Sequence, residues 1–287
     1  DTTLSPNSIA KHLKTLRAIL NKAADDGLIQ PYEIPRKLIS VKEIPPTITG
    51  LQDEELNKLI TLPIKENTDR WNARNLFLFA MYEGGIRIGD IIQLRWRNIV
   101  GDRLIYVMTK NGKQVNVILV QEAKKILMRY KRQGQRPEHY IFPYLDSNAE
   151  YAKYVDYEDR QKMPPDISKK LFETINAREA RIGMMLREIR ALTGIPHLTF
   201  HTARHTFALR AKEANVDNTT LKNILKHSSL NTTETYVKKL DCRSEDAAMR
   251  VMYLDKARKN KEKKRIIKQI QKLGFSTEEL IELLAGD

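Results

Sequence analysis

The sequence predicts a mainly α-helical protein with a small antiparallel β-sheet. In most of the chain, apolar residues recur at the spacing of a helix face, as they do in residues 5–25. Residues 104–109 and 115–120 are instead rich in β-branched and aromatic side chains, which favour strands. Asn111-Gly112 lies between these two segments, and this dipeptide is typical of a tight hairpin turn. We therefore expect one β-hairpin within a helical chain.

The charge of the chain indicates the kind of partner. The 287 residues are enough for two domains, and a hydrophobic content of 41% is enough for a packed core. Lys and Arg number 50 against 36 Asp and Glu, a formal net charge of +14. Such an excess favours nucleic acid, because each neutralised phosphate releases counterions. A membrane is disfavoured, since the longest apolar run, Leu76–Tyr82, is far too short to span a bilayer.

Cysteine content bears on the compartment. Cys242 is the only cysteine, so the chain has no internal disulfide and no cysteine-rich zinc site. This composition fits a reducing environment, and no signal peptide is recognisable. A cytoplasmic, nucleoid-associated protein is therefore expected.

The first predicted helix covers residues 5–25. Ser5 is a good N-cap and Pro6 suits the first turn. Apolar residues form one face, and the opposite face carries Lys11, Lys14 and Lys22. Taken alone, these lysines are expected to face solvent. Residues 31–50 contain four prolines and little periodicity, which predicts a linker.

The later elements are predicted from the same periodicities and from the glycines and prolines that end them. A helix begins near Leu51, and an apolar helix at Trp71–Tyr82 ends at Gly84-Gly85. Residues 144–166 are polar, rich in tyrosine and interrupted by proline, and are predicted to be a long surface insertion. Further helices are expected at residues 88–94, 167–190, 199–215 and 218–226, around Tyr236, and at 276–285 after a basic run at 256–268.

Five short segments carry residues suited to phosphate chemistry. They are Gly84–Asp90 (GGIRIGD), Lys110 in the hairpin, His201–Thr206 (HTARHT), His227-Ser228-Ser229 and Thr232–Tyr236 (TTETY). In this order they resemble the signature of the tyrosine recombinase (phage integrase) family, over roughly residues 51–240. Each segment alone is a weak signal. The ordered set is specific, because the 23 residues from Arg204 to His227 and the 9 from His227 to Tyr236 match the family pattern.

The resemblance implies a domain organisation. Residues 1–46 would be the C-terminal part of a helical core-binding domain plus the linker. Residues 47–255 would be the catalytic domain, with the tyrosine recombinase catalytic-domain fold. Residues 256–287 would be a basic C-terminal extension that ends in a helix. In the family the first two domains clamp the duplex, so Lys11, Lys14 and Lys22 would face phosphates.

The resemblance also assigns the groups that would hold the phosphate. Arg87 and Arg204 would grip its nonbridging oxygens and stabilise the transition state, a task that suits the planar, permanently charged guanidinium. His227 would be the third phosphate ligand. The arginines would supply the electrostatic stabilisation that a metal gives elsewhere, so neither metal nor other cofactor is expected.

Three further side chains would carry the covalent chemistry. Tyr236 would attack phosphorus and store the bond energy in a phosphotyrosine. His201 lies one helical turn before Arg204 and would assist deprotonation of the nucleophile. Lys110 would protonate the 5′-oxygen leaving group as general acid. Lys113 is the alternative acid, and whichever lysine is not the acid would contact a phosphate.

Supporting positions complete the set. Asp90 matches the acidic residue that supports the first arginine, although a surface ion pair between Arg87 and Asp90 would also fit the spacing. His205 is expected to pack behind the site, since no Glu follows His201 as a zinc-protease motif would require. Lys226 departs from the family, which usually has Gly before the second histidine. A non-Gly residue there restricts the turn or adds a phosphate contact.

The implied function is site-specific cleavage and rejoining of double-stranded DNA, as the integrase of a mobile element. Family members act as tetramers on paired DNA sites, and no membrane role is expected. Two alternatives remain open. One is a type IB topoisomerase-like enzyme that nicks and reseals a single duplex. The other is a non-catalytic DNA-binding protein that has kept the fold.

Overall fold

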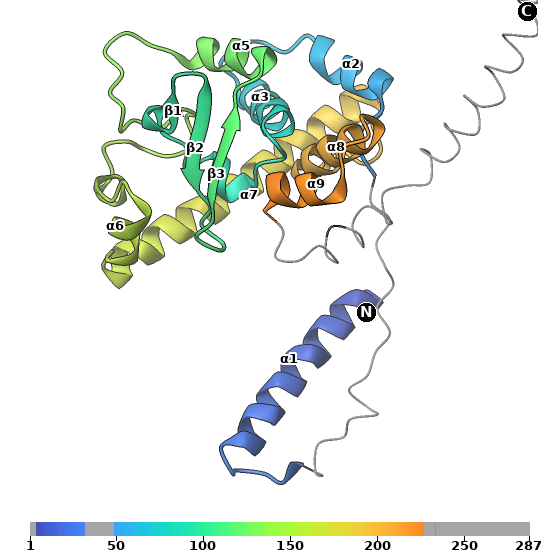
Figure 1. The fold of residues 1–287 in the computed structure, drawn as a ribbon, viewed down its shortest axis with the longest axis vertical. Coiled ribbons are helices and arrows are strands. Elements are labelled where there is room, and N and C mark those ends of the chain that lie inside the picture. The colour runs from blue at the N-terminus through green and yellow to red at the C-terminus, as the bar shows by residue number, and fades with distance from the viewer. Residues whose placement is uncertain (1–3, 32–48, 227–232, 234–287) are drawn as a thin grey trace, which may run out of the picture. The chain divides into compact units, whose positions relative to one another are not determined.

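The computed structural model describes residues 4–31, 49–226 and 233 (Figure 1). The chain divides into two compact units, residues 1–48 and residues 49–287. The described residues are mostly helical and contain a three-stranded antiparallel sheet. The predicted fold class is therefore confirmed. Among the described residues, no helix is long and apolar enough to cross a membrane.

The first unit contains helix α1 (Pro6–Asp25). As predicted, Ser5 caps it, because the Ser5 hydroxyl accepts a hydrogen bond from the Ser8 amide at 3.2 Å. Ala10 is the one buried residue of this helix, while Ile9 and Leu16 are 40% and 45% exposed. The apolar face predicted for this helix is thus largely open within its unit. The linker predicted at residues 31–50 lies mostly outside the described residues.

The second unit holds the remaining described helices and the sheet (Figure 1). They are α2 (Asp53–Thr61), α3 (Asp69–Tyr82), α4 (Ile88–Ile91), β1 (Ile99–Val100), β2 (Arg103–Val107), β3 (Gln114–Ile118), α5 (Gln121–Tyr130), α6 (Tyr157–Gln161), α7 (Pro165–Thr193), α8 (Phe200–Glu213) and α9 (Asn218–Leu225). The helix predicted at residues 88–94 is shorter than expected and ends at Ile91. The predicted helices at 167–190, 199–215 and 218–226 are confirmed.

Helix α3 is the centre of the core. Its residues Leu76, Phe77 and Phe79 have no exposed surface. Helices α5, α7 and α8 pack against it from different sides. The second half of α3 is buried on every side, so it must be covered by other elements all around. The end of α3 is therefore fixed in the interior, and the segment that follows it starts from a rigid point.

The sheet has the strand order β1-β2-β3, and both pairs are antiparallel. Tyr106 of β2 lies opposite Val115 of β3, and both side chains are buried. The alternation that predicted the hairpin thus buries one face of the sheet. Strand β1 and helix α5 were not predicted. The strand has only two residues and shows no alternation, and no side chain caps α5.

The turn of the hairpin is wider than the tight Asn-Gly turn predicted. Gly112 has a positive φ of 65°, whereas Asn111 is not among the positive-φ residues. The amide of Gly112 donates to the carbonyl of Met108 at 3.0 Å, and the amide of Met108 donates to the carbonyl of Lys113 at 3.0 Å. The Asn111 side chain instead accepts from the Lys113 amide at 3.3 Å. Only the glycine supplies the left-handed conformation, and the loop projects Lys110 from its first half.

The prediction of a surface insertion at residues 144–166 is wrong in part. Helix α6 and a 3-10 turn at Glu150–Lys153 form within it. Tyr151 and Met163 are buried there in a small second hydrophobic cluster. The burial of apolar ring surface offsets the conformational entropy that is lost when this segment becomes ordered, although the segment is polar overall. The insertion is thus a packed part of the domain beside the hairpin.

Gly85 is required where α3 ends, and this requirement can be tested. Gly85 has a φ of +70°, and a Cβ there would lie 2.8 Å from the Cα of Arg204. We expect Gly85→Ala to lower the free energy of unfolding by about 3 kcal/mol, from backbone strain plus overpacking. Urea unfolding followed by circular dichroism measures this loss.

Gly101 provides the matched control. It has a φ of +56° and open space around the added Cβ. Gly101→Ala should therefore cost only the backbone term, about 1 kcal/mol. Equal losses in the two variants would show that the close approach to Arg204 contributes nothing.

Candidate active site

Two loops and two helices converge at the end of α3. The turn Gly84-Gly85, with φ angles of +80° and +70°, reverses the chain and leads to Arg87, the N-cap of α4. Helix α8 contributes His201 and Arg204. Figure 1 shows the hairpin β2–β3 and the helices α8 and α9 on the two sides of this turn.

Arg204 is a buried cation fixed by backbone carbonyls. Its side chain is 6% exposed. The Nη1 atom donates to the carbonyl of Gly85 at 2.9 Å, and Nη2 donates to the carbonyl of Leu225. Leu225 is the last residue of α9, where unpaired carbonyls carry partial negative charge. Arg204 thus joins α8, the end of α3 and the end of α9, and its guanidinium is held in place by the protein itself.

Arg87 lies beside the start of the hairpin turn. Its side chain is partly buried, and Nη1 lies 3.8 Å from the sulfur of Met108. Met108 directly follows β2, and Lys110 comes two residues later in the exposed turn. Within the described part of the chain no ion pair joins Arg87 to Asp90, so the surface-pair alternative for Arg87 is not observed.

His201 and His205 lie on one face of α8, with their rings in contact. Their rings form an edge-to-face contact with centroids 4.4 Å apart. His201 is exposed overall, but local desolvation, followed by the positive charges of Arg204 and Arg87, lowers its pKa. Burial, His201 and Arg204 lower the pKa of His205 to about 4. Both imidazoles are therefore neutral at neutral pH, and His201 can accept a proton. The two arginine charges act on the same ring.

Asp90 holds the hairpin. Its side chain is 5% exposed, and Oδ1 accepts a hydrogen bond from the amide of Thr109 at 2.9 Å. Thr109 immediately precedes Lys110. Among the described residues, Oδ2 of Asp90 is buried without a hydrogen-bond partner. The acidic residue expected to support Arg87 thus contacts the lysine-bearing turn directly.

Glu83 is a buried carboxylic acid that sequence analysis missed. It is 3% exposed, and Oε1 accepts from the amide of Val120 at 3.1 Å. Burial raises the pKa of Glu83 to about 7, although the Val120 amide and Lys124 lower it. A charged residue directly after the apolar run that ends at Tyr82 was the available signal. Glu83 and Asp90 flank Arg87, and each accepts from a backbone amide near one end of the hairpin.

Lys226 adopts a backbone conformation for which the family's usual glycine is better suited than lysine. It ends α9 with φ 52° and ψ 39°, in the left-handed region that favours glycine. The restricted turn predicted for a non-Gly residue is therefore present. His227 and Tyr236 lie outside the described residues. Thr233, in the same motif as Tyr236, is fully buried.

The lysines expected to contact DNA are distributed over both units. Lys113 lies on the hairpin with an exposed side chain. Lys11, Lys14 and Lys22 lie on α1, and Lys22 forms an exposed ion pair with Asp26 at 2.5 Å. The structure thus gathers Arg87, Arg204 and His201 beside the hairpin of Lys110. The α1 lysines belong to the other unit.

Comparison with known proteins agrees with this architecture. The model of the phage integrase family matches residues 50–243. Tyrosine recombinase XerD of Xanthomonas axonopodis pv. citri is 26% identical over 243 residues, covering 81% of this chain and 72% of that protein. Tyrosine recombinase XerA of Thermococcus kodakarensis is 25% identical over 211 residues, covering 73% of this chain and 62% of that protein. The chain thus spans less than two thirds of the archaeal relative.

Solved structures share the fold. A lambda integrase dimer bound to a COC′ core site superposes with a TM-score of 0.53 at 16% identity, covering 82% of this chain and 80% of that chain. The Tn1549 transposon integrase in complex with circular intermediate DNA gives a TM-score of 0.50 at 17% identity, covering 86% and 79%. The chain therefore shares the fold of these integrases. Because its family match extends over most of the sequence, the chain belongs to the phage integrase family.

The raised pKa of Glu83 predicts a pH-dependent stability. Below pH 4.5 the carboxyl is protonated in both folded and unfolded chains, so folding has no ionisation cost. As pH rises from 4.5 to about 7, only the unfolded chain ionises freely, and the folded state loses stability. The loss should reach about 3 kcal/mol, at 1.36 kcal/mol per pKa unit.

Glu83→Gln removes this titration and keeps the acceptor for the Val120 amide. The stability difference between wild type and Glu83→Gln, measured by denaturant unfolding from pH 5 to pH 8, should therefore move against wild type as pH rises. Parallel stability curves would show that Glu83 does not titrate abnormally.

The backbone of Lys226 predicts a stabilising substitution. Lys226→Gly relieves the strain of a left-handed backbone at a residue with a Cβ. Glycine also raises the conformational entropy of the unfolded chain, which cancels part of this gain. We therefore expect the free energy of unfolding to rise by up to about 1 kcal/mol. Asn215 also has a positive φ of 57°, but asparagine tolerates this conformation. Asn215→Gly should therefore give a smaller gain when both variants are compared with wild type by thermal unfolding. A loss of stability in Lys226→Gly would contradict the strain.

Proposed function

We propose that this chain cleaves and rejoins DNA strands through a covalent 3′-phosphotyrosine bond with Tyr236 as nucleophile. The observation that carries the proposal is the cluster of Arg87, Arg204 and His201 beside the hairpin of Lys110. These residues come from segments far apart in the sequence. Two guanidiniums and a neutral imidazole at one place are suited to binding a phosphodiester and to transferring a proton beside it.

The two arginines are suited to the phosphate. Arg204 is fixed by the carbonyls of Gly85 and Leu225. Its charge is therefore positioned before any substrate binds, which is how electrostatic catalysis avoids reorganisation. Arg87 is more accessible, and its charge acts on the same His201 ring. Both would contact nonbridging oxygens, and His227 would add a third contact.

The proton transfers follow from the remaining groups. The phenol oxygen of Tyr236 would form a bond to phosphorus while the bond from phosphorus to the 5′-oxygen breaks. His201, whose pKa is lowered by local desolvation and by the charges of Arg204 and Arg87, would take the phenolic proton. Lys110 would give a proton to the departing 5′-oxygen, and Lys113 would contact a neighbouring phosphate. Attack by a 5′-hydroxyl would reverse both transfers and reseal the strand.

The wider context of the reaction is proposed on the same basis. Residues 1–46 would belong to a core-binding domain, and Lys11, Lys14 and Lys22 would lie on the phosphates. Lys226 would add a phosphate contact beside His227. The catalytic domain would extend over residues 47–255, with residues 256–287 as a basic extension. The substrate would be double-stranded DNA, and four protomers would assemble on paired sites.

We further propose that the biological role is integration of a mobile element. The relatives named above by sequence are Xer recombinases, whereas the structures named above are a phage and a transposon integrase. Recombination between paired sites on separate DNA molecules, which integration requires, tests this role. A type IB topoisomerase-like enzyme would relax supercoils and give no recombinant product.

A nicked suicide duplex tests the chemistry. The duplex carries the site selected by this protein from random DNA, and strand cleavage releases a short fragment that prevents resealing. The wild-type chain should accumulate a covalent protein–DNA adduct, seen as a shifted band on a denaturing gel. Tyr236→Phe should form none, because the attacking oxygen is missing. Arg87→Ala should slow adduct formation by about 10²-fold or more.

Tyr253→Phe is the matched control. It removes a phenolic hydroxyl from another tyrosine in the C-terminal part of the chain, so it should leave the adduct unchanged. Absence of adduct with the wild-type chain on DNA that it binds would favour the non-catalytic alternative and would end the enzymatic proposal.

A further inference from the structure

The hairpin that carries Lys110 is exposed at its tip. Thr109, Lys110 and Lys113 all have exposed side chains. Lysine is long and flexible, and a general acid must lie within hydrogen-bond reach of the atom it protonates. The backbone of the turn therefore has to be held from outside the sheet. The contacts of the turn identify what holds it.

Gln93, just after α4, connects the turn to the insertion. Its Nε2 donates to the carbonyl of Gly89 at 2.6 Å and lies 3.5 Å from the hydroxyl of Thr109. Its Oε1 accepts from Nη1 of Arg160 at 2.9 Å. Arg160 belongs to α6, inside the insertion. One amide side chain thus joins α4, the residue before Lys110, and the inserted helix.

A second contact comes from the same helix. Tyr157 of α6 lies against Gly112, so closely that a Cβ at Gly112 would be 3.2 Å from the tyrosine hydroxyl. Gly112 is the residue that gives the turn its left-handed conformation, with a φ of 65°. The two halves of the turn, Thr109 and Gly112, therefore each have a neighbour in or bonded to α6.

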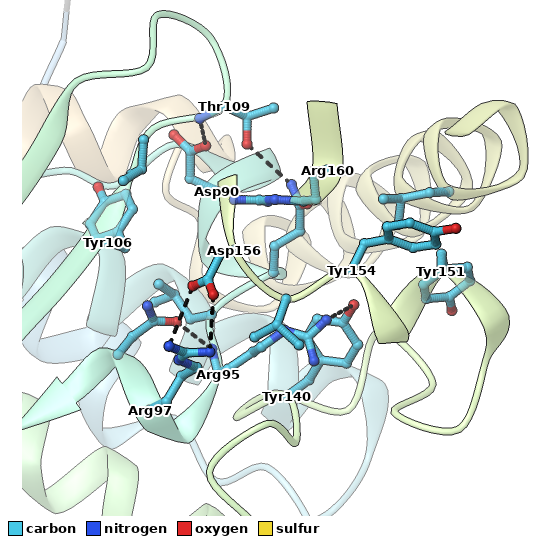
Figure 2. Close-up of a pocket in the computed structure, with 16 residues that line it drawn as sticks. Asp90, Arg95, Arg97, Tyr106, Thr109, Tyr140, Tyr151, Tyr154, Asp156 and Arg160 are labelled. Atoms are coloured by element: carbon cyan, nitrogen blue, oxygen red, sulfur yellow. Dashed lines mark hydrogen bonds and ion pairs between the residues drawn. The ribbon is translucent and has the colours of Figure 1, made fainter. Parts of the chain in front are cut away.

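Helix α6 is itself anchored to the domain. Its N-cap, Asp156, forms an ion pair with Arg97 at 3.4 Å. A pocket of about 50 Å³ lies between the insertion and the hairpin, and Asp90, Thr109 and Arg160 all line it. Figure 2 shows these three side chains near one another, with the Thr109 amide directed to Asp90. The contacts therefore form a continuous path from Thr109 in the hairpin, through Gln93 and Arg160, to helix α6 of the insertion.

We propose that Arg160, acting through Gln93, is a positioning residue that holds the Lys110 turn for proton transfer to the leaving group, with Tyr157 as a second brace. This inference rests on the proposed function, because it gives Lys110 the role of general acid. Arg160 has its Nη1 engaged by Gln93 and its Nε buried without a partner among the described residues. That placement suits a support under the hairpin and not a group that reaches the substrate.

Leaving-group substitution tests the inference. Sulfur in place of the 5′-bridging oxygen gives a leaving group that departs without protonation, so cleavage no longer needs the acid. Arg160→Met should slow single-turnover cleavage of ordinary DNA between about 10-fold and 100-fold, as expected for a misplaced acid. On the 5′-phosphorothiolate duplex the same variant should cleave at nearly the wild-type rate. Lys110→Ala should show the same pattern and serves as the benchmark.

Two further variants make the result specific. Arg178→Met removes one positive charge from an exposed position on α7 and should not alter cleavage of either DNA. Gln93→Leu keeps the volume of the side chain but removes the link, and it should behave as Arg160→Met. Gln93→Leu also serves if Arg160→Met fails to fold, which thermal unfolding reveals.

The outcomes separate the two proposals. Equal slowing of Arg160→Met and Gln93→Leu on oxygen and sulfur DNA would overturn the positioning role, because the defect would then lie outside the acid step. Wild-type rates on both DNAs would overturn it as well. Absence of any adduct with the wild-type chain would instead defeat the proposed function itself.

Discussion

The hydrogen bonds of Arg204 to two backbone carbonyls are the constraint on which the rest of the site depends. A buried guanidinium without acceptors would cost several kcal/mol, so the carbonyls of Gly85 and Leu225 must stay where they are. Gly85 permits this only because it has no side chain. The same interaction therefore fixes a charge and orders the end of α3 and the end of α9.

The hairpin is secured by two buried carboxyl groups that flank Arg87. Asp90 accepts from the amide of Thr109, before Lys110, and Glu83 accepts from the amide of Val120, just beyond β3. Burying an acid is costly, and the raised pKa of Glu83 reflects that cost. These two hydrogen bonds tie the segment that carries Arg87 to the hairpin that carries Lys110, so they fix the position of one relative to the other. The insertion adds a third support through Gln93.

Sequence reasoning succeeded where the signal was local. The capped helix at Pro6, the apolar helix α3 and the alternating strands of the hairpin were all predicted from neighbouring residues. It failed where tertiary packing decided the conformation. Asn111-Gly112 indicated a tight turn, yet only Gly112 has a positive φ. Residues 144–166 looked like solvated surface because their tyrosines are separated by polar residues, and the packing of those rings is visible only in three dimensions.

The sequence by itself determined the fold class and most helices, because periodicity acts over a few turns of chain, and its motifs nominated the candidate site residues. The order and spacing of its motifs also indicate the family. Only the tertiary structure decided how those residues are held. The bond from Arg204 to Gly85 joins positions 119 residues apart, and the link from Arg160 to Gln93 joins positions 67 apart. Such contacts form when the core packs, and no local pattern encodes them.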